Sequence, residues 1–467
     1  MQWSVLRELG FHFFTAFLIL IIAFLTNPET FSKTFYILFF FSIFSIISES
    51  LISSSIIQSK ADDESLISSM LFVSIMIGLL LGILFYFIAD YFKFFLIVTN
   101  FYFLEATIIL TIFMIIVSSV PYGLNRKNKK FKIIAFIDIF ASLVAFLLSL
   151  LVILKNYHIE ALILFLFIRT FLIFLLLFWF TKLEINIKRI KYLFKISYLD
   201  YGYKLSIFSF LKLLVRDVDK IIIGAVLGPV SLGLYTFVEN IIIRPGSLIM
   251  NGISRYNFSI FCIETIESKK IDKAYSDNLN IISLLILFII STLAILSPYI
   301  ILKFLDKSWL DSADLFLPLF GLILMKSLYS PLGDYWKSQA NFKVMYYWSI
   351  SILIFTSIIS FYGSQTGSVT LLAYLMFCLN FIILLVSLTF LKKYFIQKYF
   401  FKIRKNYAKS ISVYLLTCIL FLLNQIIFGF NLISTLIINI VTIVSIGILM
   451  RSALQSIKFN ISKLVVK

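Results

Sequence analysis

Charged residues stand inside a stretch that is otherwise apolar and long enough to cross a bilayer, 209-SFLKLLVRDVDKIIIGAVLG-228. A charged residue that faces lipid at the centre of a membrane helix costs about 2.5–3.5 kcal/mol. The helical repeat places four of them on one face about 100° wide, with Asp217 farther round: Lys212, Arg216, Asp219 and Lys220. We expect this face to be net positive and to line a water-filled cavity or a partner helix.

A cationic cavity at mid-membrane suits an anionic cargo, because Arg and Lys bind phosphate oxygens through charge-assisted hydrogen bonds. A lipid pyrophosphate that carries sugars would fit this chemistry. Three further cations in apolar runs are candidates to assist: Arg169, Arg244 and Lys326. Four acidic residues are candidates for coupling to an ion: Glu49, Glu105, Asp138 and Glu239. Structural ion pairs between helices remain the alternative for each lone charge.

A proline and a glycine interrupt one of the apolar runs, 240-NIIIRPGSLIM-250. Pro245 and Gly246 are expected to break or kink a helix and to free backbone groups near mid-membrane. Broken helices often mark binding or hinge points in transporters, and a packing kink is the alternative.

The composition excludes a soluble protein, since 61% of the 467 residues are hydrophobic and 14% are charged. Recurrent apolar runs predict an all-α polytopic membrane protein with about fourteen transmembrane helices. We place them at residues 10–27, 34–53, 65–89, 95–120, 131–154, 159–180, 204–226, 230–251, 279–302, 311–331, 345–362, 368–391, 410–429 and 432–451.

The basic residues gather in alternate loops, for example 126-RKNKK-130 and 402-KIRK-405, while the loops between them are nearly bare. This positive-inside pattern predicts that both termini lie in the cytoplasm. It also explains the net charge of +18 better than binding to nucleic acid does, so no nucleic-acid partner is expected.

The sequence contains no P-loop, HExxH or dinucleotide-binding motif. Its two histidines and three scattered cysteines form no metal-binding spacing. We therefore expect no cofactor, no metal and no enzymatic activity.

The run 219-DKIIIGAVLGPVSLGLYTFVENIIIRPGSLI-249 resembles the signature of Wzx-type polysaccharide flippases. In that family an Asp opens an apolar run to an "IG..LG" turn, followed by "LG.Y" and a later Pro. Here these features are Asp219, Gly224, Gly228, Tyr235 and Pro245. Three other stretches are similar to family loops: 51-LISSSIIQSKADDESLISSMLF-72, 304-FLDKSWLDSADLFLPLFGL-322 and 331-PLGDYWKSQANFK-343. The resemblance covers about residues 10–400 and is strongest to the colanic-acid-exporter-like branch.

This resemblance implies a MATE-like fold of the multidrug/oligosaccharidyl-lipid/polysaccharide superfamily. It implies six-helix lobes at 1–200 and 201–400, with an extra helix pair and tail at 401–467. The implied activity is translocation of undecaprenyl-pyrophosphate-linked oligosaccharide repeat units across the bacterial inner membrane by alternating access, for O-antigen, capsule or exopolysaccharide synthesis. Implied partners are this lipid-linked substrate, membrane lipids, and a polysaccharide polymerase or glycosyltransferases.

Two alternatives stay open. The first is a MATE-type drug/cation antiporter, which the net positive face in 209–228 disfavours. The second is a non-transporting scaffold for glycan enzymes, which would not need a buried cationic face.

Overall fold

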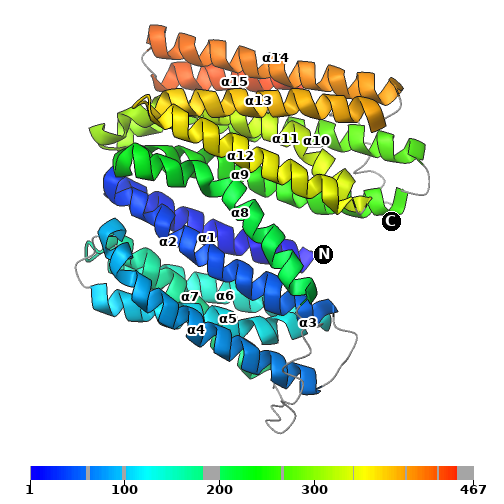
Figure 1. The fold of residues 1–467 in the computed structure, drawn as a ribbon. Coiled ribbons are helices and arrows are strands. Elements are labelled where there is room, and N and C mark those ends of the chain that lie inside the picture. Colours follow the sequence, from blue (N-terminus) through cyan, green and yellow to red (C-terminus); the bar gives the residue numbers. More distant parts are fainter. Residues whose placement is uncertain are drawn as a thin grey trace. The chain divides into compact units, whose positions relative to one another are not determined.

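The computed structural model describes residues 2–58, 64–96, 101–181, 200–264, 268–339, 341–394, 397–428 and 431–449, which are almost entirely helical (Figure 1). The chain forms two compact units, Met1–Asp217 and Val218–Lys467. The finer division at 1–200, 201–400 and 401–467 stays a prediction, and residues 450–467 of its third part lie outside the described residues.

The first unit is a helical bundle that ends within α8 (Figure 1). Its elements are α1 (Gln2–Leu25), α2 (Pro28–Ile46), the π-helix η1 (Ile47–Ser53), α3 (Ser54–Gln58), α4 (Glu64–Leu96), α5 (Phe101–Lys127), α6 (Phe131–Ile153), α7 (His158–Thr181) and the first part of α8 (Asp200–Val226). The Asn27 side chain caps α2 by accepting from the Thr30 N–H at 2.9 Å. Pro28 follows at the first position, where its missing N–H costs nothing.

The second unit begins at Val218, in the last third of α8. Its other elements are α9 (Gly228–Glu264), α10 (Ser268–Phe304), the 3-10 helix η4 (Lys307–Leu315), α11 (Phe316–Ser338), α12 (Phe342–Ser364), α13 (Val369–Tyr394), α14 (Gln397–Phe428) and α15 (Leu432–Leu449). Gly228 has a φ of +85° and permits the tight turn between α8 and α9. Pro229 then occupies the first turn of α9, as Pro28 does in α2.

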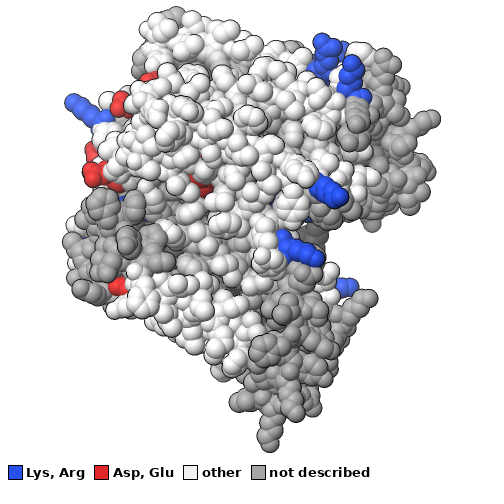
Figure 2. Space-filling view, in the orientation of Figure 1, with Lys and Arg blue, Asp and Glu red and all other residues white. Residues whose placement is uncertain are grey.

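In the part of the chain that the structure describes, a helix occurs at each of the fourteen predicted positions. In the described part of the chain, ten helical segments are long and apolar enough to cross a membrane, and His12–Leu25 and Leu432–Ile448 are shorter apolar helices. The remaining two predicted helices, α8 and α9, carry most of the charges discussed above. In the view of Figure 2, most of the described surface is uncharged, as expected of helices that face lipid. The chain is a multi-pass membrane protein, while the cytoplasmic placement of its termini stays a prediction.

Helix α6 illustrates how the sequence separates lipid-facing from buried positions. Its lipid-facing stripe consists of exposed large apolar side chains at helical spacing: Phe136, Phe140, Leu143, Leu147 and Leu151. Half of its ten buried residues are small: Ala135, Ala141, Ser142, Ala145 and Ser149. Small residues let neighbouring helices approach closely in a membrane, where lipid gives no hydrophobic drive for helix association. Asp138 is also buried.

Candidate functional site

Arg169 on α7 and Asp138 on α6 form a buried ion pair in the first unit. Arg169 Nη2 lies 3.0 Å from Asp138 Oδ1, and Arg169 Nε donates to Ser142 Oγ at 3.1 Å. The side chains are 14% and 7% exposed, respectively. Buried charges in a membrane bundle are expensive unless they are paired. The pair therefore supports the structural alternative considered for these two residues, and roles in binding or coupling stay predictions.

The α8 cations of the first unit are exposed. Arg216 Nη2 lies 2.6 Å from Asp217 Oδ2, and Arg216 Nε donates to the same oxygen at 3.0 Å. Asp217 is buried, whereas the Arg216 side chain is 57% exposed. Lys212 is also exposed, with its ammonium 4.6 Å from the centre of the Phe208 ring. Lys212 and Arg216 are four residues apart, so they present two cationic heads on adjoining turns of one helix face.

The α8 charges of the second unit form a compact network with α9. Lys220 is 2% exposed, and its Nζ lies 2.7 Å from Glu239 Oε1 and 4.0 Å from Asp219 Oδ1. Asp219 Oδ2 accepts from the Tyr235 hydroxyl at 2.9 Å, and Asp219 Oδ1 accepts from the Lys220 N–H at 2.9 Å. Tyr235 and Glu239 are four residues apart, so both face α8 from adjoining turns of α9.

This network changes the charge balance expected for the predicted face. Two carboxylates and one ammonium give the Asp219–Lys220–Glu239 group a net charge of −1 if all three are ionised. The sequence argument assigned Lys220 to a positive face, but it did not include the partner that α9 supplies. The roles of Asp219 and Lys220 in substrate binding and of Glu239 in ion coupling stay predictions.

The predicted hinge on α9 lies within a continuous helix. Pro245 is inside the helix, and Gly246 is buried against α10 and α11. A Cβ added at Gly246 would lie 2.6 Å from Ile323 Cγ1, so the absence of a side chain allows α9 and α11 to approach closely. This favours a packing role, and movement at the hinge stays a prediction. The nearby candidates Arg244 on α9 and Lys326 on α11 are both half-buried.

The remaining acidic candidates differ in environment. Glu49 lies in the π-helix η1, and its Oε1 is 2.6 Å from Arg126 Nη1 at the end of α5. Its side chain is 53% exposed. Glu105 on α5 is buried instead. Their assignment to ion coupling stays a prediction.

Sequence reasoning missed three features that depend on tertiary packing. These are the Lys220–Glu239 pair, the π-helix that contains Glu49, and an apolar pocket of the first unit. The phenylalanine run 39-FFFSIF-44 was a visible sign of the pocket, but alone it is equally typical of a lipid-facing helix. No group of three or more His, Cys, Asp or Glu that could hold a metal ion occurs among the described residues.

The fold is similar to those of two membrane transporters of known structure. It superposes on the lipid II flippase MurJ in an inward closed conformation with a TM-score of 0.70, over 96% of this chain and 100% of that chain, at 17% identity. It superposes on an inward-facing multidrug resistance MATE family transporter of the MOP superfamily with a TM-score of 0.62, over 84% of this chain and 99% of that chain, at 13% identity.

The chain belongs to the polysaccharide biosynthesis protein family, whose model matches residues 21–314. A curated relative is the teichuronic acid biosynthesis protein TuaB of Bacillus subtilis (strain 168). It is 23% identical over 194 residues, which are 41% of this chain and 40% of TuaB. The match thus spans less than half of TuaB. The cytoplasmic membrane of a bacterium is the location that fits this family and fold.

Proposed function

We propose that this chain is a flippase for undecaprenyl-pyrophosphate-linked oligosaccharide repeat units. It would move them from the cytoplasmic to the outer leaflet by alternating access, for the synthesis of a cell-surface polysaccharide. The family, the MATE-like fold and the intramembrane cations support this proposal together. Transport of this kind needs no catalytic residue, so we propose a transporter rather than an enzyme. A polymerase and glycosyltransferases are the proposed protein partners.

The observation that carries the proposal is the pair of exposed cations on α8. Lys212 and Arg216 lie in the middle of a predicted membrane span and are not buried in the protein. Two cationic groups on adjoining turns can contact oxygens of one pyrophosphate, and guanidinium groups bind such oxygens in a bidentate manner. Arg169, Arg244 and Lys326 are proposed to assist, as are Asp219 and Lys220, by orienting the cargo or supporting the site.

The test is complementation of a deletion strain with a Lys212→Gln/Arg216→Gln double variant. We expect surface polysaccharide to be lost and lipid-linked repeat units to accumulate, at normal protein level in the membrane. Lys204→Gln is the matched control, since it removes an exposed cation from the same helix outside the proposed site. Normal flipping by the double variant would overturn the assignment of these cations.

A MATE-type drug/cation antiporter is the second candidate, favoured by the excess of carboxylates in the Asp219–Lys220–Glu239 network. Drug-efflux assays in a host without other pumps discriminate between the two functions. The flippase proposal predicts no change in drug resistance when the chain is expressed. Resistance that depends on Glu239 would favour the antiporter.

A further inference from the structure

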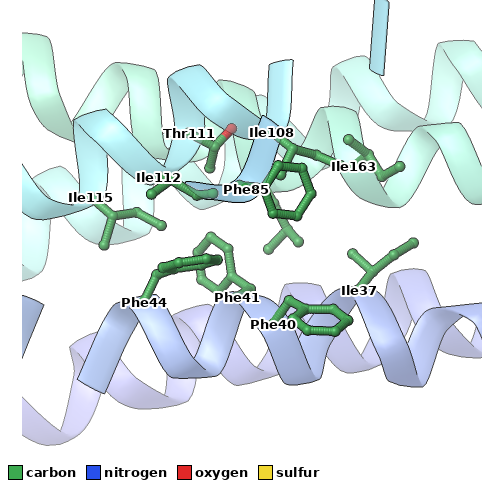
Figure 3. A pocket seen from close by; sticks show the side chains of 11 residues that line it. Ile37, Phe40, Phe41, Phe44, Phe85, Ile108, Thr111, Ile112, Ile115 and Ile163 are labelled. Atoms are coloured by element: carbon green, nitrogen blue, oxygen red, sulfur yellow. The ribbon is translucent and has the colours of Figure 1, made fainter. Parts of the chain in front are cut away.

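An apolar pocket with about 520 Å³ of space, part of it open to the surroundings, lies between α2 and three other helices of the first unit. We call it the α2 slot. Figure 3 shows phenylalanines of α2 on one side and isoleucines of α5, together with Phe85 of α4, on the other. The lining residues are Ile37, Phe40, Phe41, Phe44, Phe85, Ile108, Thr111, Ile112, Ile115, Ile163 and Leu166.

The lining has no polar group that needs a hydrogen bond from a bound ligand. Thr111 is its one polar member, and the Thr111 hydroxyl already donates to the Thr107 carbonyl at 2.6 Å. A sugar or phosphate placed there would lose its hydrogen bonds to water and gain none. Apolar cavities also exclude water. The slot therefore suits hydrocarbon, and the lining offers no acidic group for an amphipathic cation.

The slot extends along the helices. Its α2 wall runs from Ile37 to Phe44 and its α5 wall from Ile108 to Ile115. Each wall thus follows two helical turns, or about 10 Å at the rise of an α-helix. This length can accommodate a short segment of a hydrocarbon chain.

One end of the slot leads to α8. Just beyond that end, the Ser48 hydroxyl donates to the Ile115 carbonyl at 2.9 Å. Two residues farther along η1, Ser50 Oγ donates to Ser209 Oγ of α8 at 3.0 Å. Lower on α8, a Cβ added at Gly202 would clash with the carbonyl oxygen of Leu51. Residue numbers therefore rise along α8 as they fall along η1, so the two segments run antiparallel.

This antiparallel direction places the α8 cations on the same side of the Ser50–Ser209 contact as α2. Lys212 and Arg216 follow Ser209 by three and seven residues, which places all three on one face of α8. Arg216 lies about 10 Å beyond Ser209 along the helix. Phe44, at the end of the α2 wall, precedes Ser50 by a similar length of helix. The cations and the end of the slot thus lie in the same direction from the Ser50–Ser209 contact.

We propose that the α2 slot holds the prenyl units next to the pyrophosphate of the carrier lipid, while Lys212 and Arg216 hold the pyrophosphate. This inference rests on the proposed function and adds a chain-binding site to it. A ligand would be recognised by both parts at once, so a pyrophosphate with a short chain or a chain without a pyrophosphate binds less tightly. The slot would also fix the direction in which the chain leaves the head-group site.

The test measures binding of dimethylallyl pyrophosphate and farnesyl pyrophosphate to the full chain in phosphatidylcholine nanodiscs. The two probes share the head group and differ by two prenyl units. We expect the longer probe to bind wild-type protein at least about tenfold more tightly, because the added apolar groups are buried. Ile112→Trp fills the slot and should abolish this gain, and Thr111→Phe is a second variant that fills it. Ile83→Trp is the matched control, since Ile83 is 58% exposed on the outer face of α4.

Three outcomes would contradict the inference, and they can be told apart. If folded Ile112→Trp and Thr111→Phe still bound farnesyl pyrophosphate more tightly than dimethylallyl pyrophosphate by the wild-type factor, the chain-binding role of the slot would be refuted. The flippase proposal would still stand. Failure of wild-type protein to bind either probe above the level of empty nanodiscs would count against the flippase proposal as well. Binding of tetraphenylphosphonium that Ile112→Trp abolishes would reassign the slot to an amphipathic cation.

Discussion

Removing the Glu239 carboxylate should destabilise the second unit strongly, because Lys220 would keep its charge inside the protein without its nearest partner. Lys220 is 2% exposed and lies 2.7 Å from Glu239. Loss of one partner of a buried ion pair costs about 3–5 kcal/mol, since the remaining charge stays desolvated. Asp219 remains 4.0 Å from the ammonium, so we expect Glu239→Gln to cost about 3 kcal/mol, at the low end of this range.

The assay is unfolding of the purified chain in mixed detergent micelles, with the apparent free energy of unfolding compared between variants. Lys402→Met is the control, because Lys402 pairs with Asp277 at 2.9 Å but its side chain is 48% exposed. Exposed pairs contribute about 0–1 kcal/mol. The double variant Lys220→Met/Glu239→Gln should recover most of the lost stability, because it leaves no unpaired ammonium. Equal costs for Glu239→Gln and Lys402→Met would refute the reasoning.

Two further predictions concern the helix interfaces. Arg169→Met should lower the apparent free energy of unfolding by about 3 kcal/mol, because it leaves Asp138 buried without its arginine, and adding Asp138→Asn should reverse most of this loss. An additive loss in the double variant would contradict that coupling. Gly246→Ala should lower the apparent free energy of unfolding by about 1–3 kcal/mol, because the added methyl group would overpack against Ile323. Gly447→Ala is the control and should cause no measurable loss, since no atom lies within 4 Å of its added Cβ. Similar stability of the two alanine variants would show that α9 and α11 separate easily at this point.

The helices could be predicted from sequence because each membrane span needs a long apolar run. The loops that separate these runs are alternately rich in basic residues and nearly free of them. The ends were less predictable. Helix α9 was expected over 230–251 and α10 over 279–302, but they extend as Gly228–Glu264 and Ser268–Phe304. Polar residues can continue a helix beyond the apolar run, so hydropathy marks the apolar part of a helix and not its full length.

The charged residues of α8 and their helical spacing could be predicted from sequence, but their ion-pair partners on other helices could not. The helical repeat correctly indicated that Lys212 and Arg216 lie on adjoining turns of one face. It could not show that Glu239 of α9 neutralises Lys220, because that pairing depends on how two helices pack. The α2 slot was out of reach for the same reason, since its walls come from residues far apart in the chain.

The distribution of lipid-pyrophosphate-linked repeat units between the two membrane leaflets tests the central claim most directly. It would be measured in cells with and without this gene, together with the amount of surface polysaccharide. The flippase account predicts that deletion abolishes surface polysaccharide while complete repeat units accumulate in the cytoplasmic leaflet. Unchanged leaflet distribution and unchanged surface polysaccharide, in a strain without a second flippase, would contradict it.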